Sequence, residues 1–151
     1  MTFSEFVAQE PVGPGRTIIE ASAGTGKTFT ISAIVARLIA EEGVGLDEIL
    51  VVTFTRAATA ELRSRVRDRL VDTLRALDDP AAANDDEHMA VLLGTDDATR
   101  QKAAERLRAA LTHFDRAQIF TIHGFAQRLL GQLGLRPFAL GAQYLQLVLH
   151  S

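Results

Sequence analysis

The stretch Ile19-Glu20-Ala21-Ser22-Ala23-Gly24-Thr25-Gly26-Lys27-Thr28 decides the fold that this chain is expected to adopt. It matches the pattern Gly, four residues, Gly-Lys-Ser/Thr, except that Ala21 stands in place of the first glycine. Glycines let the backbone curl so that its N–H groups point at an anion, and the start of a helix adds a positive dipole end. A glycine-rich turn that merely caps a helix is the alternative, but the flanking segments favour a phosphate-binding loop between a strand and a helix.

The chemistry of this loop indicates which residues bind a nucleotide. Lys27 can reach the β- and γ-phosphates, and the hydroxyl of Thr28 can ligate Mg²⁺. The backbone of the preceding residues surrounds the phosphates in such a loop. The candidate nucleotide-binding residues are Ala21, Ser22, Ala23, Gly24, Thr25, Gly26, Lys27 and Thr28.

Short apolar runs alternate with helical patterns along the rest of the chain. Strands are predicted at 17–21, 49–53 and 117–121. Apolar residues recur at helical spacing in the segments between and after these strands: 27–42, 61–77, 99–114 and 125–133. A strand followed by a helix and a second strand is typical of a parallel sheet flanked by helices, so an α/β fold is expected. The turns that follow the three strands should meet at one edge of that sheet.

The chain of 151 residues suits one domain, with three parts expected from local composition. Residues 1–15 are an irregular lead-in rich in Pro and Gly, and 16–133 form the α/β domain. An acidic loop at about 78–97 interrupts the domain, with room for a short helix in its middle. Residues 134–151 are a divergent tail.

Charge is distributed unevenly, although the net charge is only −3. Residues 78–97 hold seven acidic and no basic side chains, so the remainder has sixteen basic and twelve acidic ones. Residues 56–75 alone carry six arginines against three acidic side chains. A cationic segment beside an anionic loop fits a phosphate-backbone partner, whereas a solvated helix with mixed ion pairs is the simpler explanation. Charge alone favours the simpler one.

Several classes of protein are not expected. The chain has no cysteine, which excludes disulfides and cysteine-based metal sites. It has no run of about eighteen apolar residues and no secretory pattern at its N-terminus, so no membrane association is expected. A cytoplasmic location is the resulting expectation.

Three segments, at 20–30, 52–62 and 120–125, resemble in their order and amino-acid sequence the first motifs of UvrD/Rep-type superfamily 1 DNA helicases. A phosphate loop alone would be weak evidence, but Thr-Phe-Thr-Arg-Ala-Ala and Thr-Ile-His-Gly-Phe follow it in the expected order. Within that group the sequences of the three segments are most similar to those of RecB-type beta subunits of exodeoxyribonuclease V. The resemblance covers about 15–133 and implies a P-loop NTPase sheet that is part of helicase motor subdomain 1A.

The resemblance also implies roles for individual residues. The first segment implies binding of ATP with Mg²⁺, the latter through Thr28. Single-stranded DNA contacts are implied for Phe54, Thr55, Arg56, Thr121 and His123. Their chemistry agrees in part, because single-strand binding needs donors for phosphates and aromatic faces for bases. Core packing of Phe54 and a purely structural helix-entry role for His123 remain the alternatives.

The sequence also departs from the family pattern. No Asp-Glu pair follows an apolar strand after Thr121, and the transition-state arginines, second motor domain and nuclease domain of the family are missing. We therefore expect these 151 residues to bind ATP without hydrolysing it. The parent activity implied is ATP-driven unwinding coupled to resection of duplex ends in recombinational repair, beside RecC- and RecD-like subunits. A stand-alone P-loop kinase or small NTPase, and a non-enzymatic remnant or binding module, are the other hypotheses.

Overall fold

A computed structural model of the chain describes residues 26–79, 87–133 and 147–148, and the structural findings below concern these residues. The expected first strand at 17–21 and the loop residues 21–25 lie outside this set. Helices and strands alternate along the described chain, as predicted. In order they are α1 (Lys27–Arg37), η1 (Leu38–Glu42), η2 (Leu46–Glu48), β1 (Leu50–Thr53), α2 (Arg56–Asp78), α3 (Glu87–Leu93), α4 (Asp97–Thr112), η4 (Phe114–Arg116), β2 (Gln118–Thr121), α5 (Ile122–Leu133) and β3 (Leu147–Val148).

The sheet is parallel, as expected, and has the strand order β2-β1-β3. Residues of β1 and β2 pair in register from Leu50 with Gln118 to Thr53 with Thr121. Every residue of β1 is buried, which explains its uninterrupted apolar sequence. On the other side of β1, Val51 and Val52 pair with Leu147 and Val148 of β3. The tail, in which no element was predicted, thus contributes a short parallel strand.

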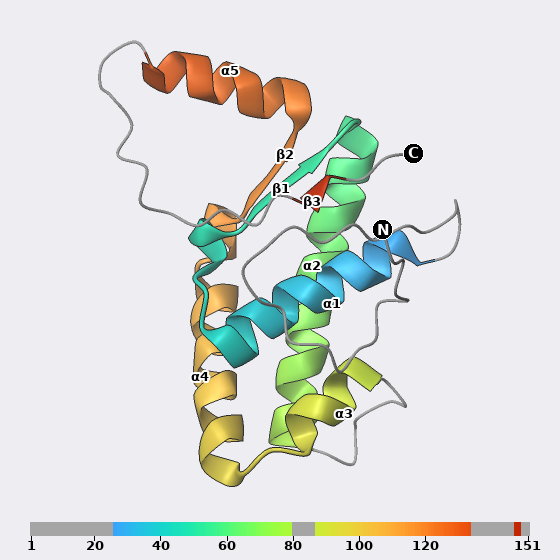
Figure 1. The fold of residues 1–151 in the computed structure, drawn as a ribbon, viewed down its shortest axis with the longest axis vertical. Helices are drawn as coiled ribbons and strands as arrows, with labels where there is room; N and C mark the ends of the chain where they lie inside the picture. Colours follow the sequence, from blue (N-terminus) through green and yellow to red (C-terminus); the bar gives the residue numbers. More distant parts are fainter. Residues whose placement is uncertain (1–25, 80–86, 134–146, 149–151) are drawn as a thin grey trace, which may run out of the picture.

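The first helix runs through α1 and the π-helical turn η1 to Gly43, which has a φ of 74° and ends it where the sequence indicated. The predicted apolar positions are all buried, yet so are Ser32, Ala33 and Arg37 on the other faces. The helical spacing of the apolar residues predicts only one buried face for this helix, and that prediction is wrong. The helix crosses the long helix α2 and also contacts α4 through η1 (Figure 1). Neighbouring elements therefore cover it on more than one side.

The helices α2 and α4 begin and end where local signals place them. Thr55 caps α2, its hydroxyl accepting the N–H of Ala58 at 3.1 Å, and α2 stops at Asp78. Asp96 caps α4, its carboxylate accepting the N–H of Thr99 at 3.0 Å. The short helix predicted inside the acidic region is α3, and residues 80–86 lie outside the described set.

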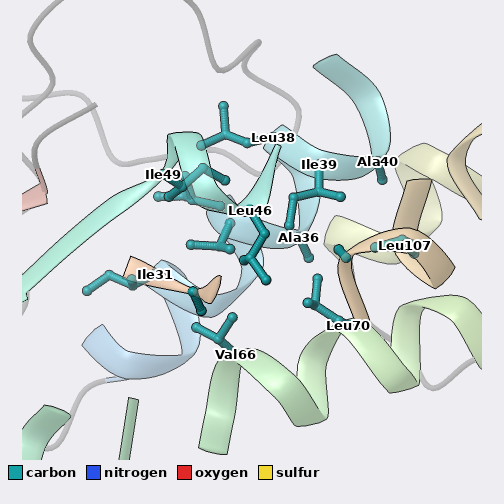
Figure 2. Packing of buried hydrophobic residues seen from close by; sticks show 14 of the residues in the cluster. Ile31, Ala36, Leu38, Ile39, Ala40, Leu46, Ile49, Val66, Leu70 and Leu107 are labelled. Carbon is teal, nitrogen blue, oxygen red and sulfur yellow. The ribbon is translucent and has the colours of Figure 1, made fainter. Parts of the chain in front are cut away.

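The core lies where α1, α2, α4 and β1 meet. The predicted stripe of α2 is buried at Leu62, Val66 and Leu70, and partly buried at Leu74 and Leu77. Figure 2 shows side chains of this cluster converging from the elements around them. Helix α5 instead projects at the far end of the molecule, where its main contacts are with β2 and β1 (Figure 1). Leu130 on α5 is accordingly 71% exposed.

Two further expectations need correction. Residues 122–125 were predicted as a turn, but α5 begins at Ile122 directly after β2. The hydroxyl of Thr121 accepts the N–H of Gly124 at 3.0 Å, so the last residue of the strand itself caps the helix. A solvated helix with mixed ion pairs, the simpler explanation of the charge in residues 56–75, would leave Arg69 in water, yet Arg69 is only 8% exposed and lies against α1.

Candidate functional site

The end of the predicted phosphate loop lies at the N-terminus of α1. Gly26 precedes the helix with a φ of 88°, a left-handed conformation that suits glycine and is costly for other residues. Its carbonyl accepts the first helical bond, from the N–H of Thr30 at 2.8 Å. Lys27 and Thr28 open the first turn, and both are partly buried. The glycine therefore turns the chain into the helix at the point where the Gly-Lys-Thr pattern requires it.

This helix end has the electrostatic character of an anion site. The N-cap is a glycine, which offers no side chain to the N–H groups of the first turn, and that turn contains no acidic residue. Helix N-termini of this kind carry a partial positive charge. The Thr28 hydroxyl supplies one hard oxygen, which fits Mg²⁺ because this ion takes few protein ligands and keeps water and phosphate oxygens. Within the described ranges, no cluster of three or more His, Asp or Glu side chains is arranged to hold a metal.

The two other predicted segments lie together at one sheet edge. Thr53 and Thr121 are partners at the carboxyl ends of β1 and β2, and the helices α2 and α5 start directly beyond them. Parallel pairing therefore brings the turn that holds Phe54, Thr55 and Arg56 beside the start of α5. Both helices present their positive ends at this edge (Figure 1).

The threonines at this edge hold the backbone in place. Thr53 is 2% exposed, and its hydroxyl oxygen lies 2.6 Å from that of Thr59 in the first turns of α2. The hydroxyls of Thr55 and Thr121 accept backbone N–H groups as helix caps. A hydroxyl that accepts such a bond still has its own proton to donate, so a capping role is compatible with a phosphate contact.

Aromatic and basic side chains accompany these threonines. Phe54 is 53% exposed, which is inconsistent with the alternative that it packs in the core. Arg56 and His123 are also exposed. The ring Nε2 of His123 lies 3.2 Å from the side-chain nitrogen of Gln127, one helical turn further along α5. The edge thus combines donors, a cation and an aromatic face, the chemistry that single-stranded nucleic acids need.

One cluster at this edge was missed by the sequence reasoning. The rings of Phe120 and Phe125 stack with centroids 6.4 Å apart, and the guanidinium carbon of Arg128 lies 5.3 Å from the centroid of Phe120. The spacing of Phe125 and Arg128 on a helix is a detectable signal, but the proximity of Phe120 follows from where α5 starts.

The arginines of α2 do not form one continuous cationic face. Arg63 donates to the backbone carbonyl of Ala117 at 3.0 Å, and Arg69 is buried. Arg75 pairs with Asp72 at 3.6 Å on the surface. Arg56, Arg65 and Arg67 remain exposed. The charge of this helix therefore divides between structural contacts and solvent.

The first turn of α1 and the carboxyl edge of β1 and β2 contact different parts of α2. Phe29, in the first turn of α1, lies against Arg69, and the guanidinium carbon is 4.8 Å from the ring centroid. Arg69 comes thirteen residues after Arg56, a rise of about 20 Å along the helix. The first turn of α1, which follows the predicted phosphate loop, therefore contacts the middle of α2 and not its first turn.

A pocket elsewhere in the fold involves none of the predicted site residues. It has a volume of about 240 Å³ and is lined by residues that precede β1 and β2, among them Leu46, Asp47, His113 and Arg116. It thus lies at the amino ends of the strands, opposite the edge described above. Among the described helices, none is long and apolar enough to cross a membrane.

Comparison with known proteins agrees with this arrangement. The model of the UvrD/REP helicase N-terminal domain matches residues 2–144. The chain is 50% identical over 120 residues to the RecBCD enzyme subunit RecB of Mycolicibacterium smegmatis, which covers 79% of this chain and 11% of that protein. It is 44% identical over 124 residues to RecB of Escherichia coli, covering 77% and 10%. The chain thus spans about a tenth of the length of the curated relatives it matches.

Proposed function

The chain belongs to the UvrD/REP helicase N-terminal domain family, and we propose that it is the ATP-binding, DNA-contacting N-terminal part of a RecB-like helicase subunit. The observation that carries the proposal is the start of α1. There Gly26, with its positive φ, leads into Lys27 and Thr28 at an N-terminus without an acidic residue in its first turn. The phosphates of a nucleoside triphosphate would accept hydrogen bonds from the N–H groups at such a helix end. The match of the family model includes these residues.

The nucleotide contacts divide among the loop residues by their chemistry. The backbone N–H groups of residues 21–26 surround the phosphates, and Lys27 neutralises the β- and γ-phosphates. Thr28 would ligate the Mg²⁺ that accompanies ATP, and this ion would supply charge compensation for the phosphates. The ammonium of Lys27 and the positive end of α1 act on the same anion, so removing either weakens binding.

Single-stranded DNA binds at the carboxyl edge of β1 and β2. The base faces stack on Phe54, and Arg56 with His123 contacts the backbone phosphates. The hydroxyls of Thr55 and Thr121 donate to the same phosphates while they cap their helices. The exposure of Phe54 and the pairing of Thr53 with Thr121 support this assignment.

The wider role follows from the relatives, which are named RecB subunits of the RecBCD enzyme. In the intact protein this domain would serve an ATP-dependent helicase and exonuclease that processes duplex DNA ends in double-strand break repair and recombination. RecC- and RecD-like chains would be its partner subunits. Such an enzyme would act in the cytoplasm, where bacterial DNA lies.

Nucleotide binding is tested by titrating the 151-residue chain with a fluorescent ATP analogue in the presence of Mg²⁺. Lys27→Ala should weaken binding by at least about tenfold, since it removes a charge that contacts the phosphates. Lys102→Ala is the matched control, because Lys102 is the chain's other lysine and lies exposed on α4. Equal binding by the wild type and Lys27→Ala would refute the assignment of the loop.

Hydrolysis is tested separately from binding. The 151 residues contain no Asp-Glu pair after an apolar strand beyond Thr121, so we expect binding without turnover, with or without single-stranded DNA. A phosphate-release assay measures this directly. Turnover that Lys27→Ala abolishes would show instead that these residues form a complete small NTPase, the competing hypothesis.

A further inference from the structure

We propose that Arg69 is a positioning residue for the nucleotide loop: its buried guanidinium holds the ring of Phe29 and thereby fixes the first turn of α1. This inference rests on the proposed function, because the turn it fixes carries Lys27 and Thr28. Neither Arg69 nor Phe29 belongs to the phosphate-loop pattern.

The contact between the two side chains has the geometry of a cation–π interaction. The guanidinium carbon of Arg69 lies 4.8 Å from the centroid of the Phe29 ring. Arg69 is 8% exposed although it carries a full charge, whereas Phe29 is 51% exposed at the end of its helix. Such interactions strengthen when the cation is withdrawn from water, so this contact is stronger than a typical surface pair.

The helix packing directs this contact to the loop. Ala33 and Ala36, on the following turns of α1, are 0% and 3% exposed and line a void of about 10 Å³ together with Arg69 and Thr73 of α2. Their small side chains bring α1 close to α2 and leave space for the long stem of the arginine. Phe29 comes two residues after Lys27, so the ring and the phosphate-binding groups move as one turn.

A second buried arginine at the same place does not have this role. Arg37 also lines the void and is 5% exposed, but its guanidinium is paired with Glu41 through two bonds of 2.8 and 3.0 Å. That pair lies within one helix, at its far end from Lys27. Arg69 instead joins two helices, and the helix it belongs to begins at the proposed DNA edge.

The test measures nucleotide affinity, fold and local order in the 151-residue chain with the variants Arg69→Met, Phe29→Leu and the two combined. Arg67→Met is the matched control, since Arg67 lies exposed on the same helix two residues away. Binding of the Mg²⁺-ATP analogue to folded protein should weaken about fivefold in Arg69→Met and should change little in Arg67→Met. The double variant should be no weaker than the worse single one, because both changes remove the same contact. Amide exchange at 28–31 should accelerate in Arg69→Met and in Phe29→Leu, and should stay unchanged in Arg67→Met.

Each outcome decides between two explanations. A purely structural role would lower the melting temperature of Arg69→Met but leave its nucleotide affinity and the exchange at 28–31 unchanged, which would overturn the inference. Arg69→Lys, which keeps a cation, should recover part of the affinity; if Arg69→Met does not fold, Phe29→Leu and Arg69→Lys supply the comparison. A wild-type chain that binds no nucleotide would refute the proposed function itself, whereas a binding wild type with unaffected variants would refute only the role of Arg69.

Discussion

Thr53 and Thr121 are paired between the neighbouring strands β1 and β2, so the final residues of these strands lie side by side although they are far apart in the sequence. Thr53 is buried and joins the first turns of α2 through Thr59, while Thr121 caps α5. Each strand end thereby determines the start of a helix. The exposed groups proposed to contact DNA project from backbone that these two threonines hold.

Replacing Phe54 separates base stacking from folding. Phe54→Ala should weaken single-stranded DNA binding by about tenfold, because stacking on one aromatic ring contributes roughly 1–3 kcal/mol per base. The free energy of unfolding should change by less than about 1 kcal/mol, since the ring is already 53% exposed. Fluorescence anisotropy with a labelled oligonucleotide measures the first quantity and urea denaturation the second. Leu130→Ala is the control, because Leu130 is 71% exposed on α5, and it should leave DNA affinity unchanged.

The cap at Thr121 is tested by removing its hydroxyl. Thr121→Ala should lower the free energy of unfolding by about 1 kcal/mol, since the N–H of Gly124 loses its acceptor. Thr121→Ser keeps the hydroxyl and should retain most of the stability. Amide exchange at Gly124, measured by NMR, should increase in the alanine variant only. Equal protection in both variants would mean that the hydrogen bond does not hold the start of α5.

Gly43 packs so closely against Arg106 that the position has no space for a larger side chain. A Cβ on Gly43 would lie 2.7 Å from the guanidinium carbon of Arg106, and Gly43 has a φ of 74°. Arg106 is held in place because it donates to the carbonyls of Ala40 and Glu41 at 2.8 and 2.9 Å. Gly43→Ala should therefore destabilise the fold by about 2 kcal/mol in thermal or chemical denaturation.

Gly131 is the matched control for this substitution. It lies within α5, where a Cβ would meet nothing within 4 Å. Gly131→Ala should stabilise the fold slightly, by roughly 0.5–1 kcal/mol, because alanine loses less backbone entropy in a helix. A similar loss of stability in both variants would show that neither the positive φ of Gly43 nor its close approach to Arg106 limits substitution there.

The cap of α4 makes stability depend on pH. Hydrogen bonds from the Thr99 hydroxyl and backbone N–H lower the pKa of Asp96 below its ordinary value of 3.8. The folded state thus binds this proton less readily than the unfolded state, so the contribution of Asp96 is complete above pH 3.8 and is lost as the pH falls through the lowered pKa. Wild type and Asp96→Asn, compared by circular dichroism during acid titration, should differ most above pH 3.8 and converge below it. A constant difference down to the lowest pH would contradict this origin.

Much of the architecture is predictable from local sequence signals. Helical spacing from Ile31 to Ile39, caps near Thr55 and Asp96, and the apolar run that became β1 all act over a few residues. The parallel direction of the strands followed from the alternation of strands and helices, because such connections leave few arrangements of the sheet. The candidate residues at the carboxyl edge were identified from the resemblance to helicase motifs, and the parallel topology explains why they lie at one edge.

Contacts between side chains of different elements could not be predicted from such local signals. The sequence does not distinguish Arg69 from Arg65 and Arg67, which are exposed on the same helix. Only the packing of α1 across α2 withdraws Arg69 from water. The cluster of Phe120, Phe125 and Arg128 likewise needs the helix to begin at once after the strand. Both depend on the packing of segments that local periodicity does not describe.

The sequence by itself determined most of the order of elements, the phosphate-loop pattern around Lys27, and the helicase-like segments that follow, because spacing and residue type carry this information locally. The tertiary structure alone decided which side chains meet. It placed Thr53 beside Thr121 through strand pairing, and it seated Arg69 on Phe29 through the packing of two helices. These contacts join residues that are distant along the chain, and burial between elements, rather than the propensity of any one element, determines them.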